Sequence, residues 1–382
     1  MRDRIKSLFR RIPSKFRDDM RFYTPSHNTM QAGYNRGFQE AFGSANKSNL
    51  AEVLAKNVAI FEGNLRGAYI GVSFRDLHGR LPPIDINATR PGWAASVIKI
   101  PVMIEVMRQV DSGEINLDDE LVVDHRFTLE DFDPISRMPE GTKVPIDKLL
   151  ELMIVVSDNE ATNMLASHVG VQRMNETMQE LGASKTMLGH LLAYNVPRYT
   201  SDWNEDGSNL TCASDMTLLL EQIYNGKSAS NPSCDAMQGI LELGGSAQLV
   251  ALLPATTVVG GKIGLISDVN SGNDTHDVGV VNSDYAIAVM CNRVGYFSTP
   301  EAKFRTTPKP DFLNDRKMDL AWAGVEALLE TFHQKVKLPF YFDLNAVAKP
   351  YFNPSSASSV ISIVSKVVHD VYYYAEVRPV KK

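Results

Sequence analysis

The segment Ser96-Val97-Ile98-Lys99 places a hydroxyl and an amine three residues apart at the start of an apolar stretch. Residues at this spacing share one face of a helix, so a helix here would stack the two side chains beside each other. The apolar residues that follow at helical spacing are Val97, Ile100, Met103, Ile104 and Met107. This pattern predicts a helix with a broad buried face, which would hold a reactive serine firmly at its start.

Two further segments carry alcohol, amide and amine groups. Ser157-Asp158-Asn159 follows an apolar helical stretch, and Gly260-Gly261-Lys262-Ile263-Gly264 lies in a strand-like run. Each segment by itself has an ordinary structural interpretation: a serine at a helix start, a capping box formed by Ser157 and Glu160, or a lysine on a sheet edge. The occurrence of all three in one order along the chain favours a shared catalytic function.

The first pattern also occurs at Ser44-Ala45-Asn46-Lys47. Its surroundings are polar and lack apolar periodicity, so no buried helix would hold this serine in place. We therefore expect the nucleophile at Ser96.

In order and spacing, the three segments resemble the signature elements of penicillin-recognising serine hydrolases, the class A β-lactamases and penicillin-binding proteins. The resemblance covers residues 48 to 333 and includes Asp111–Asp119, which is similar to the family's turn after the serine helix. It implies an α+β fold of the β-lactamase and D,D-peptidase type, with an antiparallel sheet flanked by helices and an all-helical domain. It also implies catalysis without a metal ion or organic cofactor.

The resemblance gives each motif residue a role. Ser96 is the nucleophile that becomes acylated, and Lys99 is its base. Ser157 passes a proton to the leaving group, Asn159 binds the substrate amide, and Lys262 is an electrostatic anchor. A lysine acts as a base only when neutral, which requires burial or a nearby cation to lower its pKa from about 10.4. Lys262 would supply that cation.

The strand that carries Lys262 would also bind substrate through Ile263, Gly264 and Leu265. The backbone N–H groups of Ser96 and Leu265 would form the oxyanion hole. Ile263 stands where relatives carry Thr or Ser, whose hydroxyl helps to bind the substrate carboxylate. Losing that charge-assisted bond costs about 1.5 to 3 kcal/mol, so we expect an ester or amide donor that lacks the carboxylate, unless His276-Asp277 compensates. The alternative for that pair is a structural hydrogen bond.

A second departure concerns release of the acyl group. Class A β-lactamases use a loop glutamate to activate water, but this chain has no Asp or Glu between Glu180 and Asp202. The corresponding stretch offers His190 and Asn195, and His190 has a packed, structural interpretation as well as a catalytic one. We therefore expect acylation followed by slow release, as in penicillin-binding proteins.

The alternating patterns predict a sheet domain interrupted by a helical one. The sheet would comprise residues 48–92 and 240–333, ending in a long helix at 314–333, and the helical domain residues 93–239. Residues 334–382 would form a C-terminal extension, either an edge strand pair or an interaction segment. The predicted strands are 68–74, 81–88, 257–266, 277–281 and 285–291, and the predicted helices within the insert include 146–156, 161–169, 171–181 and 215–224.

The composition is that of an ordinary globular protein: of 382 residues, 44% are hydrophobic and 22% charged, with a net charge of -6. This acidic balance gives no reason to expect nucleic acid as a partner. No apolar run approaches the roughly 18 residues of a membrane span and the start lacks a secretory signal, which points to the cytoplasm. The resemblance instead implies the periplasm or the cell exterior. The oligomeric state is not predicted.

The first 47 residues are predicted to form a basic tail. Residues 1–17 carry seven Lys and Arg side chains against one Asp. They would form either a helix that contacts an anionic membrane surface or a solvated terminus.

These observations predict a serine hydrolase that forms an acyl-enzyme with a small-molecule β-lactam, peptide or ester. The alternatives are a D,D-peptidase or esterase of the same fold, or a catalytically weak domain that senses or scaffolds.

Overall fold

A computed structural model describes residues 50–64, 68–125, 133–192, 201, 204–205, 207–251, 253–254, 256–268, 272–294 and 357–374. Its centre is a sheet of five antiparallel strands in the order β2-β1-β9-β8-β7. The strands are β1 (Tyr69–Asp76), β2 (Ile84–Ile86), β7 (Val259–Asp268), β8 (Gly272–Val281) and β9 (Tyr285–Val294). Since β1 pairs with β9, the sheet joins segments from before and after the helical insert, as predicted.

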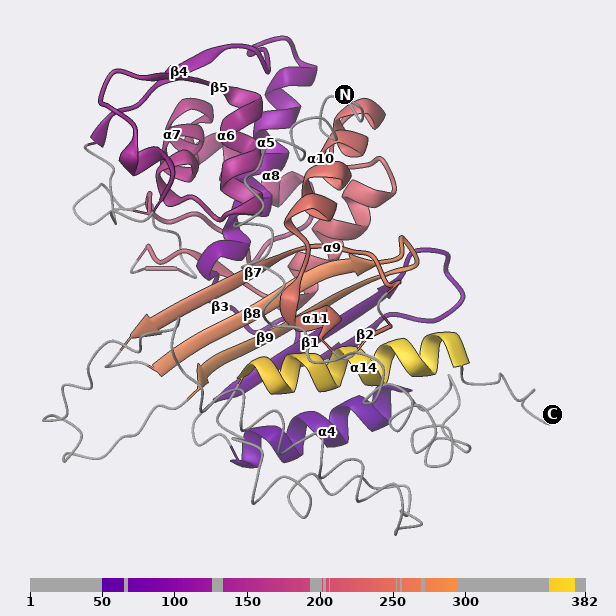
Figure 1. Cartoon of the computed structure of the whole chain (residues 1–382). Helices are drawn as coiled ribbons and strands as arrows, with labels where there is room; N and C mark the ends of the chain where they lie inside the picture. The colour runs from indigo at the N-terminus through magenta and orange to yellow at the C-terminus, as the bar shows by residue number, and fades with distance from the viewer. Residues whose placement is uncertain are drawn as a thin grey trace, which may run out of the picture.

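The helical insert lies over one face of the sheet (Figure 1). Its first elements are the 3₁₀ turn η1 (Ala95–Ile98), α5 (Lys99–Asp111), η3 (Ile135–Arg137) and α6 (Ile146–Val155), and its later ones are α7 (Asn159–Val169), α8 (Val171–Glu180), α9 (Ala213–Tyr224) and α10 (Asn231–Gly244). The short helix α11 (Ala247–Val250) follows the insert, and its Leu249 joins the hydrophobic cluster on the opposite face of the sheet. Two small ribbons complete it, β3 (Gly92–Trp93) with β6 (Leu210–Thr211) and β4 (Glu120–Val122) with β5 (Lys143–Pro145). The α+β architecture is confirmed.

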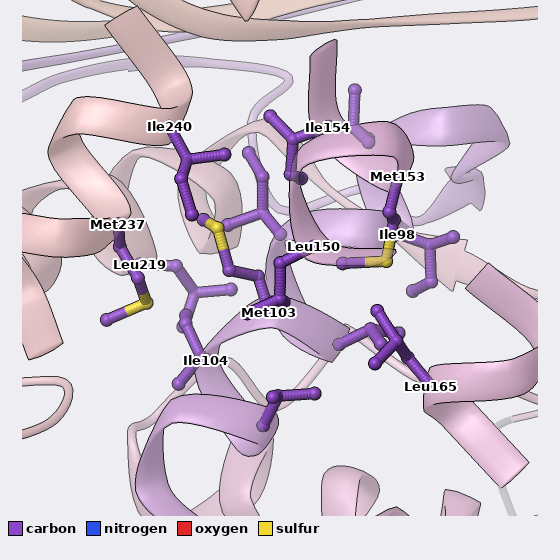
Figure 2. Packing of buried hydrophobic residues seen from close by; sticks show 14 of the residues in the cluster. Ile98, Met103, Ile104, Leu150, Met153, Ile154, Leu165, Leu219, Met237 and Ile240 are labelled. Atoms are coloured by element: carbon purple, nitrogen blue, oxygen red, sulfur yellow. The ribbon is translucent and has the colours of Figure 1, made fainter. Parts of the chain in front are cut away.

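Two hydrophobic clusters hold the layers together, one on each face of the sheet. Strand β9 supplies both, because Ala286, Ala288 and Met290 point to the first cluster while their alternating neighbours join the second. The first cluster fills the helical domain, where α5 is buried among α6, α7 and α10 (Figure 2). Burial of an apolar side chain contributes about 1.5 to 3 kcal/mol, so this packing fixes α5 and the serine turn before it.

The second cluster lies between the sheet and two helices, α4 (Leu50–Asn64) and α14 (Ala357–Tyr374) (Figure 1). Helix α14 contributes Val360, Ile361, Val364, Val367, Val368 and Val371. Residues 334–382 were expected as an appendage, either a strand pair or an interaction segment, yet α14 is a helix of the core. The helix predicted at 314–333 lies outside the described residues.

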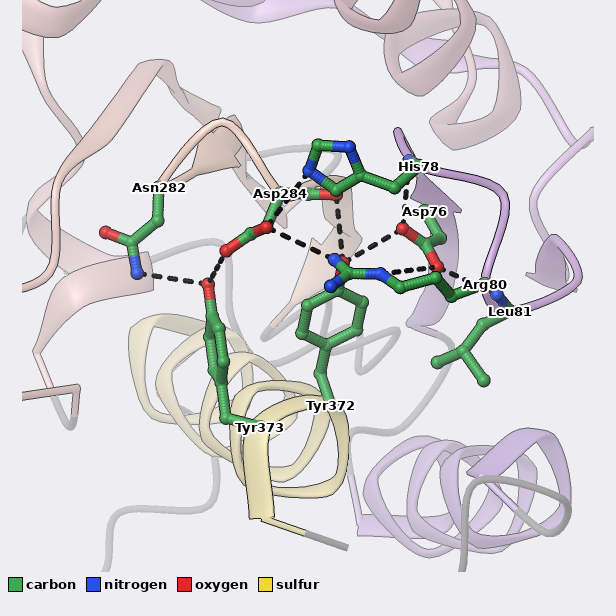
Figure 3. Close-up of polar contacts among 8 residues, drawn as sticks. All are labelled: Asp76, His78, Arg80, Leu81, Asn282, Asp284, Tyr372 and Tyr373. Atoms are coloured by element: carbon green, nitrogen blue, oxygen red, sulfur yellow. Dashed lines mark hydrogen bonds and ion pairs between the residues drawn. The ribbon is translucent and has the colours of Figure 1, made fainter. Parts of the chain in front are cut away.

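The C-terminal end of α14 is tied to two turns of the sheet (Figure 3). The Tyr372 hydroxyl donates to Asp76 Oδ1 at 2.9 Å, and the Tyr373 hydroxyl donates to Asp284 Oδ2 at 2.5 Å. Arg80 pairs with both carboxylates, at 3.6 and 3.2 Å. These contacts fix the position of α14 along the sheet.

The predicted basic tail at residues 1–47, with its Ser44–Lys47 motif, falls outside the part of the chain that the structure describes, so its contact with a membrane surface stays a prediction. Within that part, no helix is both long and apolar enough to cross a membrane.

Candidate active site

Ser96 lies in η1, immediately before α5, and is half-buried. The preceding residue, Ala95, has a left-handed backbone with φ 47°. Residues other than glycine adopt this conformation at a cost, and such strain gathers at functional sites. The strained turn places Ser96 immediately before the N-terminus of the buried helix α5.

The edge strand β7 lies directly against this turn at Gly264. A Cβ at Gly264 would stand 3.0 Å from Ala95 Cβ and 3.2 Å from the Ser96 backbone nitrogen. A Cβ at these distances is closer than ordinary van der Waals contact, so the absence of a side chain at Gly264 lets the two backbones approach closely. Leu265, the next residue, is 62% exposed. The strand and the serine turn therefore meet as the motif predicted, while an oxyanion hole formed by the Ser96 and Leu265 amides stays a prediction.

Lys99 is fully buried at the first position of α5. Its Nζ donates to the Ser157 carbonyl at 2.6 Å, to Ser157 Oγ at 3.0 Å and to Asn159 Oδ1 at 2.8 Å. The first and second motifs are thus in direct contact. These three bonds occupy the three N–H groups of the ammonium form, and no ion pair lies within 4.0 Å of Nζ among the described residues. The contact with the Ser157 hydroxyl is the one through which the amine can exchange a proton.

The second motif owes its shape to Asp158. Its Oδ1 accepts from the Ala161 N–H at 2.8 Å, which makes Asp158, and not Ser157, the cap of α7. The capping-box interpretation of Ser157 and Glu160 is therefore wrong. Ser157 has φ 62°, and this left-handed backbone turns it toward Lys99.

A reciprocal tie holds the start of α7, and the motifs gave no indication of it. Asp133 Oδ2 accepts from the Asn159 N–H at 2.8 Å, while Asp158 Oδ2 accepts from the Ile135 N–H at 2.9 Å. The first bond positions Asn159, whose side chain holds Lys99. Asp133 follows a stretch without periodicity, so only the folded chain reveals it.

Lys262 on β7 is 5% exposed, and its Nζ donates to the Ile263 carbonyl at 3.1 Å. Burial lowers the pKa of Lys262 to about 8, and Asp277 opposes this. Burial also lowers the pKa of Lys99 well below 10.5, and the charge of Lys262 lowers it further, against Asp133 and Asp158. Lys262 therefore acts on Lys99, which burial and this nearby charge drive toward the neutral form that a base requires.

The region of the missing loop acid is described only up to residue 192, so Asn195 lies outside it. His190 Nδ1 is 2.6 Å from the Leu191 carbonyl, which favours its structural interpretation. Asn163 Oδ1 accepts from the Leu192 N–H at 2.6 Å, so this stretch is attached to α7, four residues beyond Asn159.

The His276-Asp277 pair does not line the site as a unit. The His276 ring bonds the Trp93 carbonyl at 2.7 Å, while Asp277 accepts from backbone groups of α11. Neighbouring strand residues point to opposite faces of a sheet, so the two cannot jointly replace the hydroxyl missing at Ile263. The structural alternative for this pair is favoured.

Comparisons with known proteins agree with this geometry. The curated relatives include the β-lactamase VEB-1 of Pseudomonas aeruginosa, 27% identical over 194 residues, which are 49% of this chain and 64% of the relative. The extended-spectrum β-lactamase PER-1 of the same organism is 27% identical over 209 residues, 53% of this chain and 66% of the relative. The chain thus matches slightly less than two thirds of the length of these proteins.

Among solved structures, the β-lactamase of Sphaerobacter thermophilus is similar with a TM-score of 0.55 and 25% identity, over 64% of this chain and 90% of that one. PBP-A gives a TM-score of 0.55 at 23% identity, over 66% and 90%. The TLA-1 extended-spectrum β-lactamase gives 0.59 at 18% identity, over 84% and 99%, and at such identity the likeness shows the fold alone.

A family model described as the β-lactamase enzyme family matches residues 50–306. This range spans most of the chain and contains all three motifs. By sequence, fold and the meeting of its motifs, the chain belongs to the β-lactamase enzyme family.

Proposed function

We propose that this protein is a serine acyl-transfer enzyme that forms a covalent acyl group on Ser96. The observation that carries the proposal is the buried amine of Lys99, which contacts Ser157 and Asn159 one helical turn from Ser96. A serine hydroxyl is a weak nucleophile until a neighbouring base takes its proton. Burial and the charge of Lys262 favour the neutral amine that can do so.

In the proposed reaction, Lys99 accepts the Ser96 proton as the oxygen attacks the substrate carbonyl. The amides of Ser96 and Leu265 stabilise the oxyanion, and each such donor contributes about 3 kcal/mol. Ser157, bonded to Lys99, passes this proton to the leaving nitrogen or oxygen as the tetrahedral intermediate collapses and the bond between the carbonyl carbon and that atom breaks. The product is an ester of Ser96 and a released amine or alcohol, or, from a β-lactam, an amine that stays attached through the opened ring.

Release of the acyl group is expected to be slow. No acidic side chain occurs between residues 181 and 201, and the described part of this stretch offers His190, whose ring is already bonded to a carbonyl. This favours behaviour of the penicillin-binding type over rapid hydrolysis of β-lactams. A catalytically weak domain that senses or scaffolds is the alternative that the same absence supports.

The preferred acyl donor is proposed to be neutral and apolar near its leaving group. Ile263 lacks the hydroxyl that would bind a carboxylate, and the exposed Leu265 adds apolar surface beside it. An ester or simple amide is compatible with this surface, whereas a penicillin or a D-Ala-D-Ala peptide would lose a charge-assisted bond.

Mass spectrometry after incubation with penicillin or a fluorophosphonate tests the proposal. We expect an adduct on Ser96 that persists for hours and is absent from Ser96→Ala. Turnover of an aryl ester, a chromogenic cephalosporin and a D-Ala-D-Ala peptide then ranks the substrate classes. The absence of any adduct would support the scaffold alternative, and undiminished acylation of Lys99→Ala would contradict the assignment of the base.

A further inference from the structure

Asp277 is a fully buried carboxylate on β8 that the proposed mechanism does not use. Its Oδ2 accepts from the Ser246 hydroxyl, from the Gln248 N–H at 3.2 Å and from the Leu249 N–H at 3.0 Å. Its Oδ1 is buried and has no hydrogen-bond partner among the described residues. A buried carboxylate with one unpartnered oxygen is costly to a fold, and such groups call for an explanation in function.

The sheet places Asp277 directly behind Lys262. In the register of β7 and β8, Asp277 stands opposite Ile263 and Lys262 stands opposite Val278. The two side chains therefore leave adjacent positions of neighbouring strands and point to opposite faces. They make no direct ion pair within 4.0 Å. Both are shielded from water, so their charges interact through the sheet with little screening.

Among the described residues, Asp277 is the charged group that favours the ammonium form of Lys262, and the charge of Lys262 in turn favours the carboxylate form of Asp277. The other buried ionisable side chains among the described residues of these elements are Asp274 and His276 on its own strand, Tyr285 and Cys291 on the paired strand β9, and Lys366 and His369 on α14, which packs on α11. The His276 ring is directed to the Trp93 carbonyl. Serines 362 and 365 of α14 donate to the Gln248 and Leu249 carbonyls.

We propose that Asp277 is a positioning residue of the acyl-transfer site, whose carboxylate acts from behind the sheet to hold Lys262 as an ammonium ion. This inference rests on the proposed function. A charged Lys262 keeps Lys99 neutral, and it also attracts the carboxylate of an anionic probe such as penicillin. Three buried groups on three elements are thereby coupled, from Asp277 on β8 through Lys262 on β7 to Lys99 on α5.

The coupling gives a defined pH signature. Burial raises the pKa of Asp277 to about 7, so its charge is present above neutrality and lost below it. At pH 5 Lys262 is an ammonium ion with or without Asp277, whereas at pH 8 its charge depends on the carboxylate. Asp277→Asn keeps the acceptor for Ser246 and α11 and removes the charge. If the pKa of Lys262 is about one unit lower in this variant, the fraction of Lys262 that is charged at pH 8 falls about fivefold.

The test compares the full-length protein, Asp277→Asn and the control Ser365→Ala, which loses a hydrogen bond to α11 but leaves every hydrogen bond of Asp277 in place. Lysine labelled with ¹³Cε and ¹⁵Nζ reports the titration of Lys262 by NMR. We expect a lower Lys262 pKa in Asp277→Asn and an unchanged one in Ser365→Ala. Acylation of Ser96 by penicillin should match wild type at pH 5 and be about fivefold slower at pH 8.

Equal titration of Lys262 in wild type and Asp277→Asn overturns the proposal, as does an equal shift in Ser365→Ala, which would indicate altered packing. If Asp277→Asn fails to fold, reciprocity supplies a second test: Lys262→Met must raise the pKa of Asp277, followed by its ¹³C carboxyl resonance. An unchanged Asp277 titration overturns the proposal. If wild type never acylates Ser96, the proposed function fails, but the lysine titration still decides the coupling.

Discussion

At the scale of single residues, the site depends on the close approach of strand β7 to the serine turn and on the charges of two buried lysines. Gly264 and Ala95 show the first, because the edge strand touches the serine turn where one side chain is absent. Lys99 and Lys262 show the second, because two buried amines lie near each other without a direct counter-ion among the described residues. Both features can be altered by single substitutions that leave most packing unchanged.

Gly264→Ala is expected to slow acylation of Ser96 by roughly tenfold to a hundredfold. Its Cβ would lie 3.2 Å from the Ser96 nitrogen, so β7 must move away and the oxyanion donors separate. Rapid-mixing measurements with a reporter ester check this rate. Gly239→Ala is the matched control, because nothing lies within 4 Å of its Cβ within α10. It should raise stability by about 0.5 to 1 kcal/mol and leave the rate unchanged. Equal rates for both variants would show that this contact does not shape the site.

Lys262→Met is expected to move the acid limb of the acylation profile to higher pH. Neutral Lys99 is the active form, so the rate rises as pH passes through the pKa of Lys99, which burial and Lys262 hold well below 10.5. Removing the cation raises that pKa, and more alkaline solution is needed to deprotonate the base. Rates with a neutral aryl ester between pH 5 and 10 separate this effect from substrate attraction. An unshifted limb would mean that Lys262 does not influence the base.

The motifs themselves were predictable, because residues three apart on a helix and a lysine between glycines are visible in the sequence. The contact between Lys99 and the second motif follows from the family resemblance and is confirmed. Asp133 and the position of Asp277 behind Lys262 were not predictable. They depend on a loop without periodicity and on strand register, and neither leaves a local pattern.

At the scale of elements, the hydrogen bonds at the start of α7 fix the geometry of the second motif. Asp133 and Asp158 exchange backbone bonds between the segment before α7 and the segment leading into η3. Such ties fix a loop more firmly than one cap, because each segment positions the other. Asn159 and Ser157 therefore face Lys99 in one arrangement.

Asp158→Ala is expected to cost about 2 to 4 kcal/mol of unfolding free energy. It removes the cap of α7 and leaves the buried Ile135 N–H without its partner. Urea denaturation measures this change. Ser230→Ala, which removes the cap of α10, should cost about 1 kcal/mol, because its bonds are at the surface. Equal losses in the two variants would contradict the role of the reciprocal tie.

Helix α14 shows why element type was harder to predict than motif. Its apolar residues are mostly Val and Ile, which favour strands by local propensity. Four polar side chains in its buried part, Ser362, Ser365, Lys366 and His369, interrupt the apolar pattern. Tertiary packing against α4 and the sheet overrides these local preferences, and no analysis of periodicity alone would supply that information.

At the scale of the whole molecule, two layers of helices enclose one sheet, and the serine turn and the helical motifs lie on one face of it. The opposite face is closed by α4 and α14 (Figure 1). Asp277 lies on that closed face, so the proposed control of Lys262 depends on a layer that never meets substrate. A substitution that weakens the packing of α14 should therefore lower the free energy of unfolding while changing the rate of acylation little.

Tyr372→Phe is expected to lower the unfolding free energy by about 1 to 3 kcal/mol, because the buried Asp76 carboxylate and the Asp284 carbonyl lose its hydroxyl. The ring packing against Phe74 and Tyr285 is retained. Thermal unfolding followed by circular dichroism provides the measurement. Acylation of Ser96 at 25 °C should be within twofold of wild type. A large loss of acylation in a stable variant would instead place α14 in the working of the site.

The separation of α14 along the chain has a consequence for biosynthesis. Strand β9 ends at Val294 and α14 begins at Ala357, so the sheet is translated well before the helix that shields its second face. Until α14 has been synthesised, the apolar side chains of Ile287, Val289 and Cys291 lack its cover. A nascent chain at this stage is a natural client for a holdase, and ribosomes stalled shortly before residue 357 should yield aggregation-prone intermediates.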